Sequence, residues 1–96
     1  MHTTTGAQSR PCDFCHAHPP RWTFPARDAT WRACSPCQGL IVLDRWERLL
    51  KRAARAYLRR VGSLGVPALV GLSDHHDRFR ATRVAGAPAP LAGRGR

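Results

Sequence analysis

The sequence predicts a small α+β fold, and three patterns along the chain support this prediction. Two Cys-x-x-Cys pairs near the start account for all four cysteines. Between the pairs lie eighteen residues, in which two short stretches alternate apolar and polar side chains as β-strands do. A long amphipathic helical pattern follows the second pair. At 96 residues we expect one domain with a limited core, to which a bound metal would add stability.

The four cysteines predict a metal site. Cys12 pairs with Cys15 and Cys34 with Cys37, and the short spacing lets one tight turn aim both sulfurs of a pair at the same ion. Four thiolates complete the tetrahedral shell of a structural zinc and leave no open position for catalysis. We therefore predict one structural Zn²⁺ bound by these four residues.

Two other uses of the cysteines remain open. Disulfides would suit an oxidising compartment, whereas the N-terminal segment MHTTTGAQSR lacks the apolar core of a secretion signal. A thioredoxin-like redox pair would need a βαβ setting, whereas these pairs bracket a hairpin pattern. Both observations favour zinc, and with it a reduced, cytoplasmic location.

Composition and charge divide the chain unevenly. Residues 1–44 carry four Arg against three Asp, whereas residues 45–96 carry twelve Lys or Arg against three acids. The strongly basic second half favours a polyanionic or acidic partner. We expect four parts: a disordered leader (1–10), a zinc finger with a basic helix (11–61), a loop and short helix packing on the core (62–84), and a flexible Arg-bearing tail (85–96).

The segment between the cysteine pairs predicts a hairpin. Arg21–Phe24 and Ala29–Ala33 alternate in polarity, and the Pro-Ala-Arg-Asp sequence between them suits a turn. Alternation places Trp22 with Phe24 on one face, and Trp31 with Ala33 on one face. We expect the three aromatic residues to cover the zinc site and pack on the following helix. A base-stacking platform is the alternative use of the same side chains.

The second cysteine pair is predicted to open a helix. Ser35 is the expected N-cap and Pro36 the first helical residue. Cys37 then lies at a helix N-terminus, where free N–H groups and the helix dipole stabilise thiolate charge. The order of knuckle, hairpin and cysteine-bearing helix is that of a treble clef. A zinc ribbon would instead carry both pairs on hairpin tips.

A second, longer helix follows. Asp44 and Glu47 form a capping-box-like pair, and Gly62 ends the pattern after Val61. Apolar residues at steps of three and four form one stripe, which consists of Trp46, Leu49, Leu50, Ala53, Tyr57 and Val61. The basic residues of the same helix form the predicted binding surface: Arg45, Arg48, Lys51, Arg52, Arg55, Arg59 and Arg60.

This basic helix has three possible uses. Nucleic acid is the favoured partner, engaged mainly through phosphates. The alternative is a small adaptor or inhibitor, with a phage as one source, that docks on an acidic surface of a bacterial protein such as the transcription or defence machinery. A solvated helix face is the third possibility, although such faces normally mix charges and here only Glu47 is acidic. Membrane binding is not expected, because the tryptophans of the finger should cover the apolar stripe.

The C-terminal third carries weaker patterns. Residues 62–67 suggest a loop, and Ala68–Leu72 suggests one helical turn interrupted by Gly71. Ser73 or Asp74 can cap a short helix over His75–Val84.

Catalysis is not expected, and neither is a small-molecule substrate. Nucleases built on a treble clef need a hairpin His and a metal-binding His or Asn on the next helix, and this chain has neither. His16 and His18 are expected to be exposed, although His16 can donate a hydrogen bond to a sulfur. The Asp74–Asp77 cluster can be a second metal site or an acid–base pair, but helix capping with exposed histidines is favoured.

Residues 11–55 resemble a group of small actinobacterial and actinophage proteins of unassigned function. The shared features are a first Cys-x-x-Cys, the hairpin segment WTFPARD, the sequence WRACSPC and an acidic-Trp helix start. The resemblance implies a treble-clef zinc finger and gives no activity. A fainter similarity links the cysteines to the finger of the DksA/TraR transcription regulators. Those proteins place a coiled coil before the finger, which this chain lacks, so their function is not carried over.

Overall fold

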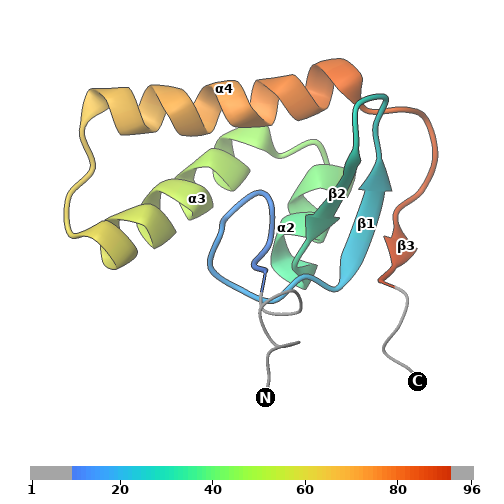
Figure 1. The fold of residues 1–96 in the computed structure, drawn as a ribbon, viewed down its shortest axis with the longest axis horizontal. Helices are drawn as coiled ribbons and strands as arrows, with labels where there is room; N and C mark the ends of the chain where they lie inside the picture. Colours follow the sequence, from blue (N-terminus) through green and yellow to red (C-terminus); the bar gives the residue numbers. More distant parts are fainter. Residues whose placement is uncertain (1–9, 92–96) are drawn as a thin grey trace.

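The computed structural model describes residues 10–91 and has a small α+β architecture with a three-stranded antiparallel sheet. Most of the expected leader (1–9) and the end of the expected tail (92–96) lie outside the described residues. The elements in chain order are β1 (Trp22–Pro25), β2 (Thr30–Ala33), α2 (Ser35–Val42), α3 (Trp46–Val61), α4 (Val66–Thr82) and β3 (Ala89–Pro90) (Figure 1).

The predicted hairpin is confirmed. β1 and β2 pair antiparallel, with Trp22 opposite Ala33 and Phe24 opposite Trp31. The turn between them is held by α4, because the Arg27 N–H donates to the carbonyl of Thr82 at 2.7 Å.

The third strand was not expected. β3 pairs antiparallel with β1 on the edge away from β2, and the Leu91 N–H donates to the Arg21 carbonyl at 2.9 Å. The interpretation of residues 85–96 as a flexible arm is therefore wrong for the part that pairs. The Ala-Pro composition of this segment gives no strand signal. The strand forms because the free edge of β1 offers unpaired backbone N–H and C=O groups to this segment.

The two helices after the hairpin occur as predicted, but their caps differ. Cys34, with extended backbone, is the N-cap of α2, and Ser35 lies inside the helix. Arg45 is the N-cap of α3, and neither cap residue makes a side-chain capping bond. Asp44 adopts a left-handed conformation (φ 58°), and its carboxylate accepts a hydrogen bond from the Trp46 indole at 2.9 Å. The capping box is therefore wrong, because the Asp44 side chain is engaged elsewhere.

α4 is one helix of 17 residues, where two short pieces were expected. Gly71 does not interrupt it, since one glycine inside a helix costs only about 1 kcal/mol. Burial of Leu72, His76 and Phe79 along one face outweighs this cost. Pro67 falls in the first turn, where a missing N–H removes no helical hydrogen bond.

The core is an aromatic cluster that joins the first cysteine loop, the hairpin and α4. Phe79 of α4 is fully buried, with its ring 4.9 Å from Phe14, 5.7 Å from Phe24 and 5.2 Å from Trp31 between centroids. The inner hairpin aromatics therefore pack on α4, whereas the sequence suggested the helix directly after the hairpin. Trp22 is only half-buried and donates from its indole N–H to the Ser35 hydroxyl at 3.3 Å.

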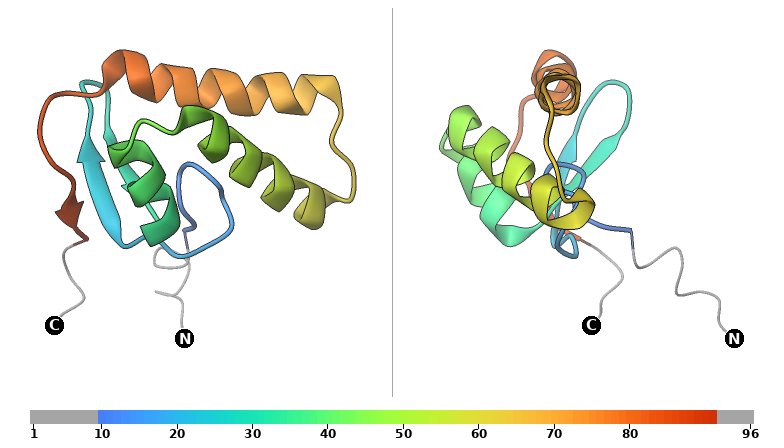
Figure 2. Two further views of the ribbon diagram at one scale, coloured as in Figure 1. Left: turned by 180° about the vertical axis from the view of Figure 1, so that it is seen from behind. Right: turned by 90° about the vertical axis from the view of Figure 1, so that its left-hand side faces the viewer.

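The helices lie on one side of the hairpin and along the top of the molecule. In the right-hand view of Figure 2, α2 and α3 lie on one side, the hairpin turn on the other, and α4 at the top between them. The loop that carries the first cysteine pair lies between α3 and the hairpin (Figure 1). Within residues 10–91, no helix has both the length and the apolar character that crossing a membrane requires.

Candidate metal centre

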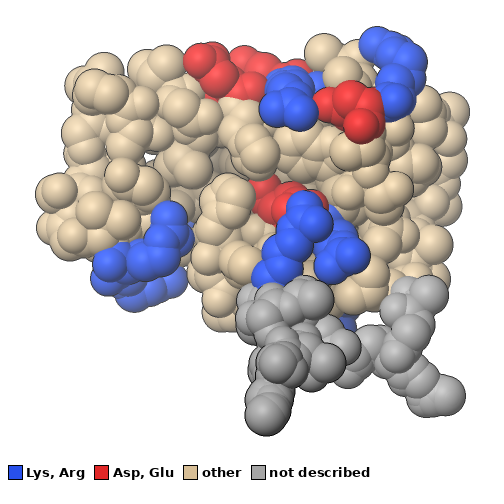
Figure 3. All heavy atoms as spheres, in the orientation of Figure 1, with Lys and Arg blue, Asp and Glu red and all other residues tan. Residues whose placement is uncertain are grey.

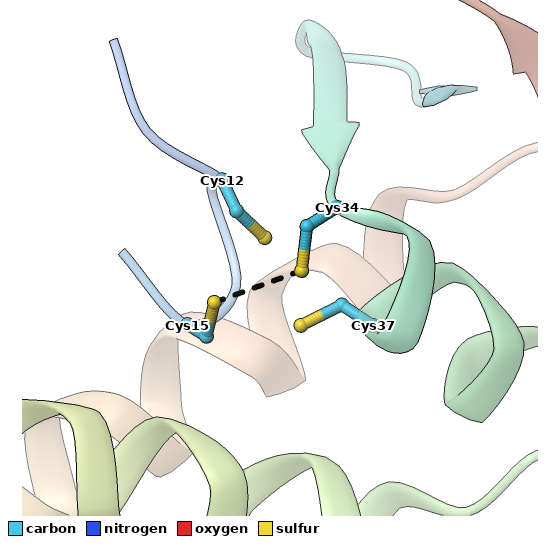
Figure 4. A group of neighbouring side chains, drawn as sticks. All are labelled: Cys12, Cys15, Cys34 and Cys37. Atoms are coloured by element: carbon cyan, nitrogen blue, oxygen red, sulfur yellow. Dashed lines mark hydrogen bonds between the residues drawn. The ribbon is translucent and has the colours of Figure 1, made fainter. Parts of the chain in front are cut away.

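The four cysteines meet at one point, as predicted. Their sulfurs all lie within 4.8 Å of one another, and the Cys15 and Cys34 sulfurs are 3.8 Å apart (Figure 4). Four sulfurs around a zinc at its usual bond length would be about 3.8 Å apart. All four side chains are buried. The donor set and its spacing therefore suit a tetrahedral metal ion.

The first pair lies in a tight loop, which we call the knuckle (residues 12–18). The loop closes through two backbone hydrogen bonds, from the Cys12 N–H to the His18 carbonyl at 2.8 Å and from the His16 N–H to the Cys12 carbonyl at 2.9 Å. His16 takes a left-handed conformation (φ 59°) at the turn. The Phe14 N–H donates to the Cys12 sulfur at 3.3 Å, so backbone dipoles point toward sulfur charge.

Asp13 fixes the knuckle against the hairpin. Its carboxylate accepts the Arg32 N–H at 2.7 Å, and its own N–H donates to the Arg32 carbonyl at 2.8 Å. Arg32 belongs to β2, which runs directly into Cys34. The two halves of the metal site are thereby held in register by groups that are not ligands.

The sulfurs compete for protons. Hydrogen bonding to the Cys12 sulfur lowers the pKa of Cys34 to about 6 and also lowers the pKa of Cys15. Hydrogen bonding with Cys15 raises the pKa of Cys12, and hydrogen bonding with Cys12 raises the pKa of Cys37. Four negative charges at this distance repel strongly, so complete ionisation requires a cation among them. The chemistry of the site thus favours a bound metal ion.

Arg52 of α3 also belongs to this site, although the sequence pattern predicts it on the outer, basic surface. Its guanidinium donates to the Cys34 sulfur at 3.8 Å and the residue is partly buried. Burial alone would lower the pKa of Arg52, but its hydrogen bonds with Cys34 and Cys37 outweigh this and raise it. The missed signal is positional, because Arg52 lies three residues after buried Leu49 and four before buried Ala56.

Two histidines of α4 form hydrogen bonds with backbone carbonyls of the knuckle. The Nε2–H of His75 donates to the Asp13 carbonyl at 2.8 Å, and that of His76 donates to the Phe14 carbonyl at 3.0 Å. His76 is buried, so the expectation of exposed histidines in the Asp74–Asp77 cluster is wrong for this residue. It lies four residues after Leu72 and three before Phe79, a spacing that marks the inner face of a helix.

The other histidines and acids form no second metal site. Among residues 10–91, the four cysteines are the one group of three or more potential ligands close enough to share an ion. His16 is half-buried, with its ring centroid 5.4 Å from that of His75, and burial lowers its pKa. His18 is exposed, as expected.

The remaining predicted binding residues lie on the surface of α3. Six of the seven are exposed: Arg45, Arg48, Lys51, Arg55, Arg59 and Arg60. Within the described part of the chain, the ion pairs are Arg10–Asp13, Arg78–Asp28 and Arg80–Asp77, and none involves α3. Figure 3 shows basic and acidic atoms side by side on the face that α4 and the hairpin present. The six exposed basic residues therefore have no carboxylate partner within residues 10–91, whereas the basic residues of α4 are partly paired.

Comparison with known proteins found no matching protein-family model, curated protein or solved structure. The resemblance to small actinobacterial and actinophage proteins stays a prediction. The geometry itself establishes a small α+β fold with a four-cysteine cluster that suits a metal ion.

Proposed function

We propose that the cluster binds one structural zinc in a treble-clef finger. Four closely spaced sulfurs with no further ligand position support this, since such closed shells stabilise a fold and leave the metal no site for substrate. A binding role without catalysis is the corresponding expectation. Thiolate ligands must remain reduced, which favours the cytoplasm.

The zinc assignment predicts that metal and fold are lost together. Native mass spectrometry should find one zinc per chain, and a strong chelator should abolish the helical circular dichroism, because the sulfurs form part of the core. Added zinc should restore the signal. A metal-free chain with unchanged helical signal would contradict the assignment.

We further propose that α3 binds nucleic acid through phosphate contacts. The supporting observation is a row of exposed basic side chains that have no acidic partner among residues 10–91, at Arg48, Lys51, Arg55 and Arg59. Steps of three and four residues keep these side chains on one side of the helix. From Arg45 to Arg60 the helix is about 22 Å long, enough to follow several phosphates of one strand. Backbone contacts of this kind carry little sequence information.

The decisive experiment compares two double variants that change the net charge by the same amount, one on α3 and one on α4. Arg55→Glu/Arg59→Glu should reduce affinity for a labelled oligonucleotide at least tenfold, because it removes phosphate contacts and adds repulsion. Arg78→Glu/Arg80→Glu on α4 changes net charge equally at residues that already have acidic partners, and should have a much smaller effect. Equal losses would show that net charge alone determines binding.

Salt dependence completes the test. The logarithm of affinity should fall linearly with the logarithm of salt concentration, with a slope of about 0.9 per phosphate contact on duplex DNA. Arg55→Gln should lower the slope by about one contact. Absence of binding to duplex and single-stranded probes at low salt would reject this function.

The alternative function is docking on an acidic surface of another protein. One observation favours it: apolar side chains are exposed around the α3–α4 connection, at Leu58, Val61, Val66, Leu69 and Val70. Exposed apolar groups of this kind are typical of protein interfaces. No acidic residue occurs between Arg48 and Ser73, so this part of the surface would not repel an acidic partner. A partner complex that survives high salt and is lost in Val66→Ser/Val70→Ser would support this alternative over phosphate binding.

A further inference from the structure

Arg52 differs from the other bases of α3 in where its guanidinium lies. Arg48 and Arg55, about one turn before and after it, are exposed, whereas Arg52 is partly buried and reaches the Cys34 sulfur at 3.8 Å. The Nε–H of Arg52 is buried and has no hydrogen-bond partner in the described part of the chain. α3 thus turns one cation inward, toward the cysteines.

A cation withdrawn from water requires a compensating negative charge. No carboxylate within residues 10–91 pairs with Arg52, so sulfurs are its nearest source of charge. Neutral thiols would leave the guanidinium uncompensated. Four thiolates around a divalent ion carry a net charge of −2, which the guanidinium reduces by half. The position of Arg52 is therefore matched to the metal-bound, fully ionised cluster.

We propose that Arg52 is a positioning residue of the metal centre, which stabilises the bound metal by donating to the Cys34 thiolate and by offsetting cluster charge. The same contact attaches α3 to the second cysteine pair, since Arg52 is the α3 side chain that hydrogen-bonds to a cysteine sulfur in the described chain. Metal binding and the orientation of the basic face are then coupled through one side chain. This inference rests on the proposed zinc site and does not depend on the identity of the partner.

Three variants test the proposal: Arg52→Gln, Arg52→Lys, and Arg55→Gln as the control that removes an exposed base from the same helix. Zinc affinity is measured by competition with a chromophoric chelator. Removal of a group that supports a metal ligand typically costs about 10–100-fold in metal affinity. We expect that loss for Arg52→Gln, a smaller loss for Arg52→Lys, and no change for Arg55→Gln.

Cobalt substitution separates a role at the sulfur from a general role in folding. A hydrogen bond to a thiolate lowers the energy of its lone pairs, so Arg52→Gln should move the thiolate-to-cobalt charge-transfer band to longer wavelength. Arg52→Lys should move it less. If Arg52→Gln does not fold with metal, Arg52→Lys provides the test: a band at longer wavelength than in the wild type supports the proposal, and an unmoved band overturns it.

Unchanged affinity in Arg52→Gln would overturn the proposal. A loss of affinity with an unmoved band would also overturn it, because a merely structural role predicts that result. Wild-type protein without zinc would instead reject the metal assignment itself, so the two failures are distinguishable.

Discussion

At the scale of single residues, His76 shows how one buried polar side chain connects distant segments. Only 4% of its surface is exposed, and its Nε2–H satisfies the Phe14 carbonyl inside the knuckle. The other ring nitrogen, Nδ1, is buried and has no hydrogen-bond partner within residues 10–91. Protonation would place an unsatisfied charged N–H in the core, and burial accordingly lowers the pKa of His76 from 6.5.

The lowered pKa predicts acid sensitivity. Below pH 6.5 the unfolded chain binds a proton at this position that the folded chain excludes, so stability falls as the pH decreases toward the native pKa. One such proton contributes a slope of up to about 1.4 kcal/mol per pH unit. His76→Gln keeps a donor for Phe14 without titrating, and its zinc-saturated urea stability should depend less on pH. Identical slopes for the wild type and His76→Gln would contradict this assignment.

The sequence revealed some site residues and concealed others. Cys12, Cys15, Cys34 and Cys37 were predictable because paired cysteine spacing has few other uses. The roles of Arg52 and His76 depend on which side of a helix meets the knuckle, and that contact joins residues far apart in the chain. The available signal was a polar residue at an inner helical position. The prediction followed residue type instead, since Arg and His are usually exposed, and it therefore placed both side chains on the surface.

At the scale of elements, the helices differ in whether their own sequence or their contacts with distant segments determine where they form. α3 has a strongly periodic pattern and ends at Gly62 in a left-handed conformation (φ 95°), and its boundaries were predictable within one or two residues. α4 carries two apolar clusters separated by Gly71, and the hairpin and knuckle supply the packing that makes it continuous. β3 similarly forms only because the free edge of β1 is within reach.

The continuity of α4 predicts that Gly71→Ala is stabilising. Gly71 is exposed, and an added Cβ would meet no atom within 4 Å. Replacing an interior helical glycine by alanine should raise the free energy of unfolding by about 0.5–1 kcal/mol. Urea denaturation of the zinc-saturated protein measures the change.

Gly62→Ala provides the contrasting variant. Its left-handed conformation makes a Cβ unfavourable, so this change should lower stability by about 1–2 kcal/mol. Destabilisation by Gly71→Ala would favour two separate helical segments over one helix.

At the scale of the whole molecule, the metal site and α4 share one core. Phe79 contacts the knuckle through Phe14 and both hairpin strands through Phe24 and Trp31. The division into a zinc finger (11–61) and a later packing segment (62–84) describes the sequence pattern, whereas the buried cluster draws on both parts. The knuckle is thus held by His76, which follows Phe14 by 62 positions.

Phe79→Ala tests whether this shared core determines metal binding. Truncating a fully buried phenylalanine typically costs about 3–5 kcal/mol. Because metal binding is coupled to folding, part of this loss should appear as weaker zinc affinity, although Phe79 is no ligand. Urea denaturation and chelator competition on the same protein measure the two effects. Leu69→Ala, at a position of α4 that is 38% exposed, should change both much less. If Phe79→Ala lowers stability but binds zinc as tightly as the wild type, the finger folds without α4 and the core is not shared.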